Sequence, residues 1–454
     1  MLKNKLSNNR IRSACILGAG ALLRFLYVCF STIYDRQYDI GMIDLDAGHT
    51  ITGGHLAYIQ YLYENFRLPD IDPTSVYQFH HPPFHHYVCA LWMRFVSLFV
   101  HNTDIIEESM QVIPFVCSLV ILVCAAEIFK LLKITGKAYN CVLMIVAFHP
   151  ALVLLSGSVN NDCMALMFTV LTVYTAMRWM QDKSLKHLCL TGLMLGLGIC
   201  TKQNVAELAF PLAIIMLIVL IDSIRDKNKR VGKFIGQYAL FGLISIPIGM
   251  WFYVRNLVKY NVSMLWVYEL PKDSWQYTGD MPVINRFLWP VPAEMIDNIK
   301  HFKIGCGYNV WMQLIRTSVL GEWDMASVGK GIKVVAVLLM LVGAGLAVVA
   351  FAGFVRGFLT DRSSITLAEG RLYRIFFVMS YVVVMIFYFE FVYKYPQECS
   401  MSFRYIEITL FLQTAGLGLA LNRTESKVML RLINIAVVAF ACLSVIMCGV
   451  WMFG

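Results

Sequence analysis

Long apolar runs follow one another along most of the chain, separated by polar segments. A helix needs roughly 20 apolar residues to cross a bilayer. The 454 residues contain about eleven runs of suitable length, and we expect membrane-spanning helices at about 12–33, 110–131, 138–157, 162–180, 187–202, 204–222, 233–255, 333–355, 372–394, 402–421 and 430–452. The pattern predicts an all-α polytopic membrane protein.

Two polar segments are long enough to carry structure of their own. The first, at 34–109, lies between the first and second predicted spans, and the other, at about 256–331, lies between the seventh and eighth. Within the first, the apolar stretch 84–100 is short and holds Arg94. We expect it to form a helix in the membrane interface rather than a span.

Basic residues fall in every second short loop, as the positive-inside rule requires. With a cytoplasmic N-terminus, the inner loops hold Lys130, Lys133 and Lys137, then Arg178, Lys183 and Lys186, then five basic residues at 225–233, then Arg356, Arg362, Arg371 and Arg374, and finally Arg423, Lys427 and Arg431. This pattern predicts that 34–109 and 256–331 lie outside the cytoplasm.

Composition agrees with a membrane protein, since 58% of the residues are hydrophobic and only 15% are charged. The formal net charge of +9 follows from the basic inner loops, and we expect no nucleic-acid partner. The 13 cysteines form no CxxC pair, which favours buried small hydrophobes over a metal or disulfide framework. The first apolar run follows a basic start and has no clear cleavage site, so we expect it to be an uncleaved span.

The opening external loop concentrates the residues suited to chemistry. It carries Asp39, Asp44, Asp46, Asp70 and Asp72, carboxylates that could supply a general base, and the histidine-rich stretch QFHHPPFHHY at 78–87. Four imidazoles near carboxylates are also compatible with a divalent metal ion. We favour a site without metal or other cofactor.

Several polar residues map to the external ends of the predicted spans. Asp162 opens the fourth span, Lys202 lies between the fifth and sixth, Arg255 ends the seventh, and Arg404 follows the ninth. Each residue on its own is compatible with helix capping or with snorkelling towards the interface. Their common depth favours a shared polar cavity, in which cations could hold a phosphate by charge-assisted hydrogen bonds.

The chain resembles bacterial glycosyltransferase family 39-like membrane proteins, relatives of the protein O-mannosyltransferases and of the lipid A aminoarabinose transferase. The resemblance is carried by RQYDIG, GGHLAYIQYLYENFRLPDIDP, QFHHPPFHHY, FHPALVLLSGSVNND, GLGICTKQ, YVRN, TSVLGEW and MSFRYIE, in consistent order along the chain. It implies the GT-C type A fold, with about eleven transmembrane helices and interfacial helices in the first external loop. It also implies a catalytic transmembrane module at 1–255, an external segment at 256–331 and C-terminal transmembrane helices at 332–454.

The resemblance implies roles for particular residues. An acid near the start of the first external loop is the base, for which Asp39 is favoured over Asp44 and Asp46; the adjacent Asp-Glu pair of the mannosyltransferases is absent here. Asp162 is the second acid, and Lys202 contacts the donor phosphate. The expected substrate-binding set is His55, Tyr58, His80, His81, His85, His86, Asn161, Lys202, Arg255, Glu322, Arg404 and Tyr405.

The implied reaction moves a sugar, with inversion, from a polyprenyl phosphate to a hydroxyl of a glycan, lipid or protein acceptor. It takes place on the extracytoplasmic side of a bacterial plasma membrane. The alternative is a transporter or flippase for a lipid-linked sugar or other solute. That alternative predicts charged residues deep within spans and inverted repeats. Glu207 and Glu390 are the nearest candidates for such charges, and no inverted repeat is evident.

Overall fold

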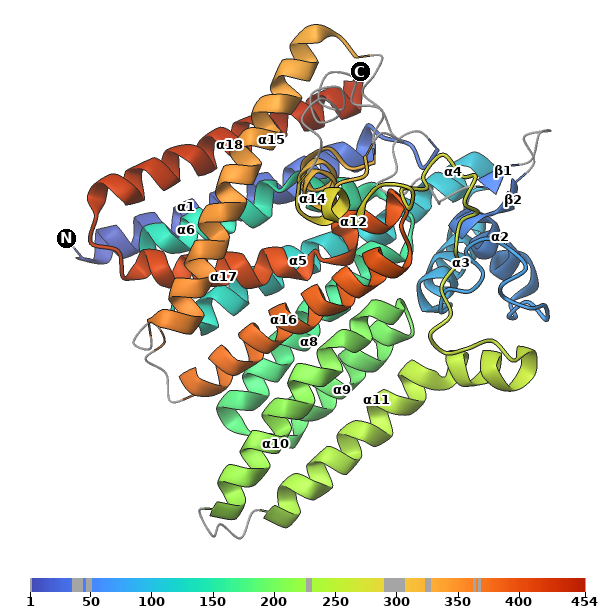
Figure 1. The fold of residues 1–454 in the computed structure, drawn as a ribbon, viewed down its shortest axis with the longest axis horizontal. Coiled ribbons are helices and arrows are strands. Elements are labelled where there is room, and N and C mark those ends of the chain that lie inside the picture. Colours follow the sequence, from blue (N-terminus) through green and yellow to red (C-terminus); the bar gives the residue numbers. More distant parts are fainter. Residues whose placement is uncertain are drawn as a thin grey trace.

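The computed structural model describes residues 2–34, 44–45, 51–225, 231–289, 307–322, 328–361, 365 and 369–453. These residues form a bundle of long helices with a group of shorter helices at one end (Figure 1). The long helices are α1 (Leu2–Cys29), α5 (Val112–Leu131), α6 (Gly136–Phe148), α8 (Asn161–Asp182), α9 (Leu185–Ile199), α10 (Ala209–Arg225), α11 (Val231–Tyr260), α15 (Lys330–Phe354), α16 (Gly370–Lys394), α17 (Ile408–Asn422) and α18 (Lys427–Phe453).

Eight helical segments in the described residues are long and apolar enough to cross a membrane, and α6 with its continuation α7 (Pro150–Leu154) and η3 (Leu155–Gly157) is a bent ninth candidate. The predicted all-α, multi-pass architecture is therefore confirmed. The remaining two predicted spans coincide with α9 and α17, apolar helices of 15 residues each. These two are shorter than a bilayer normally requires, so the count of eleven spans stays a prediction.

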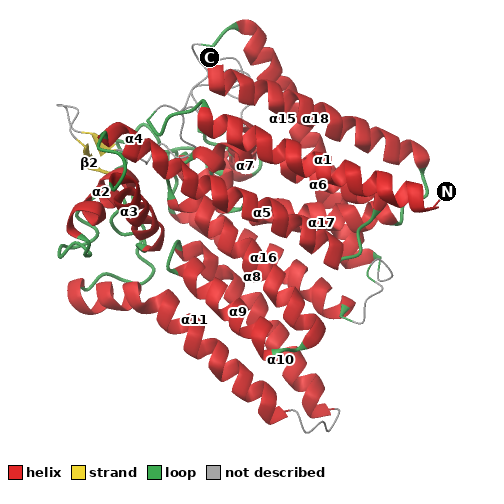
Figure 2. Ribbon diagram, turned by 180° about the vertical axis from the view of Figure 1, so that it is seen from behind, coloured by secondary structure: helices red, strands yellow, loops and turns green. Residues whose placement is uncertain are grey.

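The predicted first external loop folds over one end of the bundle (Figure 2). Its described part contains two short antiparallel strands, β1 (Asp44–Leu45) and β2 (Ile51–Gly53), followed by α2 (Gly54–Asn65), α3 (Phe84–Ser97), α4 (Thr103–Glu108) and η2 (Ser109–Gln111). The buried side chains of α2 and α3 share a small apolar core separate from that of the bundle. The stretch 84–100 thus forms a 14-residue helix on α2, as the sequence predicts.

Further short elements lie in the second external segment and at the helix turns. They are η4 (Gln203–Leu208), α12 (Val283–Phe287), α14 (Val310–Leu320), the π-helical turn η5 (Val355–Thr360), η6 (Cys399–Met401) and η7 (Phe403–Tyr405). Asn309 caps α14, because its side-chain oxygen accepts hydrogen bonds from the backbone N–H groups of Trp311 and Met312 at 3.2 Å each.

A buried arginine explains how the bent span is tolerated. Pro150 has no N–H, so the carbonyl of Val146 has no intrahelical partner, and the chain bends by 53° at this point. Arg24 of α1 is fully buried and donates hydrogen bonds to the carbonyls of Ala147 at 2.6 Å and Val146 at 3.4 Å, and to Ser118 Oγ at 2.8 Å. The charge inside the first span therefore satisfies backbone groups that the bend leaves unpaired.

Helices α15 and α17 approach each other closely because glycines face each other at the contact. A Cβ added at Gly416 of α17 would lie 2.4 Å from the Cα of Phe354, and one added at Gly353 of α15 would lie 2.6 Å from the Cα of Leu417. Small residues that bring backbones together in this way are typical of helix pairs in membranes.

Candidate active site

Asp162 is fixed at the first turn of α8 by its neighbours. Asn160 is the N-cap residue, and its side-chain oxygen accepts a hydrogen bond from the backbone N–H of Asp162 at 3.1 Å. Asn161 donates its side-chain amide to the carbonyl of Thr201 at 3.2 Å, which ties the start of α8 to the turn after α9. The Asp162 side chain is consequently buried at a helix N-terminus, where a negative charge is favoured.

Lys202 reaches the same point from the turn between α9 and η4. Its backbone is extended, and its N–H donates to the carbonyl of Gly198 at 2.8 Å. Its ammonium group forms a buried ion pair with Asp162 Oδ1. Two residues that lie 40 positions apart in the sequence thus form the centre of the site, as their shared external depth predicts.

Arg404, in the short helix η7, supplies a second cation. Its Nη1 lies 3.6 Å from Asp162 Oδ2, and its Nε lies 3.7 Å from Glu322 Oε1. The ring of Tyr405 has its centroid 5.1 Å from both Lys202 Nζ and Arg404 Cζ, within cation–π range. The structure therefore brings together Asp162, Lys202, Glu322, Arg404 and Tyr405 of the expected set.

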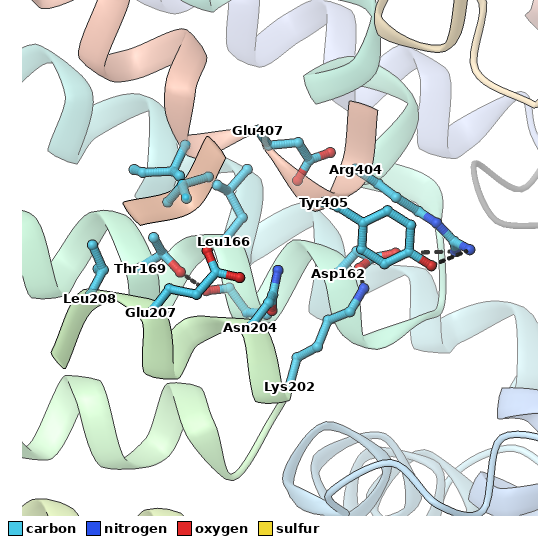
Figure 3. A pocket seen from close by; sticks show the side chains of 13 residues that line it. Asp162, Leu166, Thr169, Lys202, Asn204, Glu207, Leu208, Arg404, Tyr405 and Glu407 are labelled. Carbon is cyan, nitrogen blue, oxygen red and sulfur yellow. Dashed lines mark hydrogen bonds and ion pairs between the residues drawn. The ribbon is translucent and has the colours of Figure 1, made fainter. Parts of the chain in front are cut away.

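Of these side chains, Asp162, Lys202, Arg404 and Tyr405 line a cavity between α8, η4, α16 and the start of α17 (Figure 3). Two further acids line it, Glu207 of η4 and Glu407, the N-cap residue of α17. Glu407 is buried and interacts electrostatically with Asp162, Lys202 and Arg404. Among the described residues, the acids around the two cations outnumber them, so a phosphate bound here would have to displace a carboxylate from Lys202 or Arg404.

The histidines form a second cluster beside this cavity. His55 Nδ1 and His86 Nε2 are 2.9 Å apart, so one ring donates a hydrogen bond to the other. The ring of His81 stacks on His55, and His80 lies against His81 and against Trp266 of the second external segment. Burial lowers the pKa of His85 to about 3 and the pKa of His86 well below its ordinary value. His85 and His86 are therefore neutral near pH 7, and the cluster is held together by hydrogen bonds and ring contacts.

The histidine stretch is joined directly to the turn that holds Lys202. The backbone N–H of Phe84, at the start of α3, donates to the carbonyl of Cys200 at 3.2 Å. Burial is the main cause of a lowered pKa at His80 and His81, and the nearby charge of Lys202 contributes to it. Tyr58 packs with its ring centroid 4.5 Å from those of His86 and Phe79. His80 and His81 therefore lie near Lys202.

Where a metal ion is concerned, the described part of the chain contains no group of three or more His, Cys, Asp or Glu side chains placed to hold one. The histidines instead contact one another, Cys89 and aromatic rings. These contacts pack the histidine rings against neighbouring side chains.

Three predicted acids cannot be placed by their side chains. Asp39 and Asp46 lie outside the described residues, and only the backbone of Asp44 is described, in β1. Arg255 does not line the cavity: it donates to the carbonyl of Pro69 at 2.8 Å and to the side-chain oxygen of Asn256 at 2.9 Å. It links the C-terminal part of α11 to the loop after α2, and its substrate-binding role stays a prediction.

Sequence reasoning did not select Glu407 as a site residue, although the stretch MSFRYIE that carries the resemblance ends with it. It also passed over Arg316 and Glu398, a buried ion pair at 3.2 Å behind Glu322. A charged residue inside an otherwise apolar segment was the available signal for Glu407 and for Arg316.

Comparison with known proteins gives one family match. Residues 80–251 match the family model described as dolichyl-phosphate-mannose-protein mannosyltransferase. The matched stretch includes the histidine segment, Asp162 and Lys202. The predicted resemblance to mannosyltransferase relatives is therefore confirmed over this part of the chain. A search of curated proteins found no match.

Solved structures of membrane transferases overlap the chain at low sequence identity. ArnT from Cupriavidus metallidurans bound to undecaprenyl phosphate is 14% identical, with 90% of this chain and 77% of that chain covered and a TM-score of 0.40. The Archaeoglobus fulgidus oligosaccharyltransferase in the apo form is 12% identical, with 97% and 56% covered and a TM-score of 0.49. This chain thus spans little more than half of the archaeal protein.

Proposed function

We propose that this multi-pass membrane protein is a glycosyltransferase of the GT-C type that moves a sugar from a polyprenyl phosphate to an acceptor hydroxyl. The observation that carries the proposal is the buried cluster of Lys202, Asp162 and Arg404, placed beside the neutral histidines. The match of residues 80–251 to a mannosyltransferase family model supports the same reaction class.

Each part of the cluster has a task in this reaction. The phosphate of the donor binds between Lys202 and Arg404, which stabilise the negative charge that grows as the sugar–phosphate bond breaks. Asp162 holds the two cations in place before the donor arrives. Because a phosphate is a good leaving group, the departing lipid phosphate needs electrostatic stabilisation more than a proton.

The acceptor hydroxyl needs a general base, and the favoured candidate is Asp39, with Asp44 and Asp46 as alternatives. The base removes the acceptor proton while the hydroxyl oxygen attacks the anomeric carbon from the face opposite to the phosphate, so that the configuration inverts. The histidines, His55 and His81 among them, line the path of the sugar as hydrogen-bonding groups.

The proposed setting is a bacterial plasma membrane with the N-terminus in the cytoplasm and the site on the extracytoplasmic side. The basic loops of the chain support this orientation. The lipid chain of the donor stays in the bilayer while its phosphate reaches the cavity at the end of the bundle. The acceptor is a glycan, a lipid or a protein.

Transfer from radiolabelled polyprenyl-phosphate hexoses by purified protein, with a cell-envelope fraction as acceptor, tests the proposal. Wild type should transfer label with or without EDTA, and Asp39→Asn should lose transfer while still inserting into the membrane. Activity retained in Asp39→Asn would move the base to Asp44 or Asp46, and loss of activity with EDTA would restore the metal hypothesis. No transfer from any donor, with lipid binding retained, would favour the transporter alternative.

A further inference from the structure

A second polar cavity lies next to the one that holds Lys202. It is lined by residues of α14, of the segment before α12 and of the turn before η6, including Gln276, Gln313, Arg316, Glu322, Glu398 and Cys399. None of these residues belongs to the cluster of Lys202, Asp162 and Arg404 proposed to bind phosphate. The cavity therefore needs an explanation of its own.

Buried polar side chains form its frame. Glu398 Oε1 accepts hydrogen bonds from Gln313 Nε2 at 3.1 Å and from Arg316 Nη1 at 3.2 Å. Gln313 is 1%, Arg316 4% and Glu398 8% exposed. Burying a charged pair and an amide costs free energy unless each polar group has partners. Apolar residues of similar volume would stabilise the fold at least as well, so these polar residues suggest a role in binding.

The two cavities share a wall. Glu322 lines the second cavity, and its Oε1 lies 3.7 Å from Nε of Arg404, which lines the first. Close by, Thr317 Oγ1 of α14 accepts a hydrogen bond from the backbone N–H of Phe403 at 2.9 Å. A ligand in the second cavity would consequently be separated from the proposed phosphate position only by the side chains of Glu322 and Arg404.

The acids of the second cavity each face a cation. Arg316 is paired with Glu398, and Glu322 lies beside Arg404 of the first cavity. A phosphate bound here would have to displace Glu398 from Arg316. Carboxylates, an arginine and amides together offer donors and acceptors at fixed positions, which suits an uncharged ligand with several hydroxyl groups.

We propose that this second cavity binds saccharide hydroxyls, either those of the sugar on the donor lipid or those of the acceptor glycan. The proposal rests on the function proposed above, because the phosphate cluster fixes where the reacting sugar must be. In this arrangement Glu398 and Gln313 select the saccharide, and Lys202 and Arg404 hold the phosphate.

The first test uses the unmodified protein and Cys399, a half-buried cysteine in the cavity lining. Alkylation of Cys399 by a small neutral maleimide is followed by peptide mass spectrometry with sugar-free polyprenyl phosphate, with glycosylated donor and with acceptor. We expect a sugar-bearing ligand to slow alkylation roughly five-fold and sugar-free lipid to leave it unchanged. Equal alkylation with every ligand, or protection by the sugar-free lipid, would overturn the proposal.

The second test is kinetic and decides the matter alone if Cys399 proves unreactive. Glu398→Gln should raise KM for one saccharide substrate about ten-fold, as expected for a lost hydrogen bond to a charged group. Its binding of sugar-free polyprenyl phosphate should stay within two-fold of wild type. A raised KM for the donor identifies the transferred sugar as the ligand, and a raised KM for the acceptor identifies the acceptor glycan.

The matched control is Gln413→Ala on α17, whose amide donates a hydrogen bond to the hydroxyl of Tyr381 at 3.2 Å and which lines neither cavity. It should change neither KM. Unchanged KM values in a folded Glu398→Gln protein would overturn the saccharide site while leaving the proposed transferase intact. Absence of both transfer and polyprenyl-phosphate binding in wild type would instead overturn the proposed function.

Discussion

At the residue scale, the site depends on charges that are costly to bury singly. Lys202 and Asp162 are each under 10% exposed and neutralise each other. Removing one partner of such a pair leaves an uncompensated buried charge, which typically costs about 3–5 kcal/mol, whereas replacing both partners is often nearly neutral. Stability and activity should therefore respond differently to single and double changes.

We expect Lys202→Met to lower kcat/KM for transfer by about 10–100-fold, because a charge-assisted hydrogen bond to the donor phosphate is lost. It should also lower the thermal unfolding midpoint in detergent. The double variant Lys202→Met/Asp162→Asn should regain much of that stability without regaining activity. Kinetics with a labelled donor and thermal unfolding of the same preparations provide the measurement.

Lys259→Met is the matched control for this prediction. Lys259 also pairs with an aspartate, Asp70, but both side chains are about half exposed or more. Exposed ion pairs contribute little to stability, so this variant should resemble wild type in both assays. Transfer by Lys202→Met at the wild-type rate would show that the donor phosphate does not bind at Lys202.

At the element scale, the contact between α15 and α17 depends on the absence of a side chain at Gly416. Gly416→Ala should force the two backbones apart and lower the unfolding midpoint by several degrees, since overpacking costs about 1–3 kcal/mol. Gly345→Ala on α15 is the control because a Cβ there meets nothing within 4 Å. Equal midpoints for the two variants would show that the helices can separate without cost.

The burial of the histidines between helices should make the free energy of unfolding depend on pH. In the folded protein the pKa of His85 is about 3, against 6.5 ordinarily, because the ring is buried. Below about pH 6.5 the unfolded chain therefore binds a proton at His85 that the folded chain cannot bind. The contribution of His85 to the free energy of unfolding is constant above that pH and falls as the pH drops towards 3.

This dependence can be measured as the unfolding midpoint between pH 4.5 and 8. His85→Gln should flatten the acid side of the curve, because the variant has one imidazole fewer to protonate on unfolding. His187→Gln is the control, since His187 lies at the start of α9 beside Asp182 and away from the cluster. An unchanged acid slope in His85→Gln would assign the dependence to other groups.

Helices could be predicted from the sequence to different degrees. Each of the eleven spans predicted from apolar length alone falls on a helix. The short length of the stretch 84–100 and the presence of Arg94 within it were the reasons for not predicting a span at α3. The bend at Pro150 and the role of Arg24 could not be predicted, because they depend on which carbonyls another helix presents. Lys202 and Asp162 were expected at one depth, yet their direct pairing is set by the turn at 200–203.

The second cavity was beyond sequence reasoning for a related reason. Arg316 and Glu398 are 82 residues apart in the sequence, and neither belongs to a recognisable motif. Only the packing of α14 against the turn before η6 brings them together.

At the scale of the whole molecule, the position of the loop helices at one end of the bundle predicts sidedness. Ser75 lies on an exposed turn of that loop, and Ser426 lies exposed between α17 and α18. In intact cells, a membrane-impermeant maleimide should label Ser75→Cys, and Ser426→Cys only after permeabilisation. Each variant is compared with the parent protein, and the reverse pattern would invert the proposed topology.

The hydrogen bond from Phe84 to Cys200 has a consequence for the order of events in a catalytic cycle. It joins the loop that carries the histidines to the turn that carries Lys202, so a ligand that repositions Lys202 also biases the loop. Coupling of this kind is reciprocal: a bound lipid donor favours one loop arrangement, and that arrangement retains the donor. Steady-state kinetics should then be compulsory-ordered, with donor first and the spent lipid phosphate last to leave.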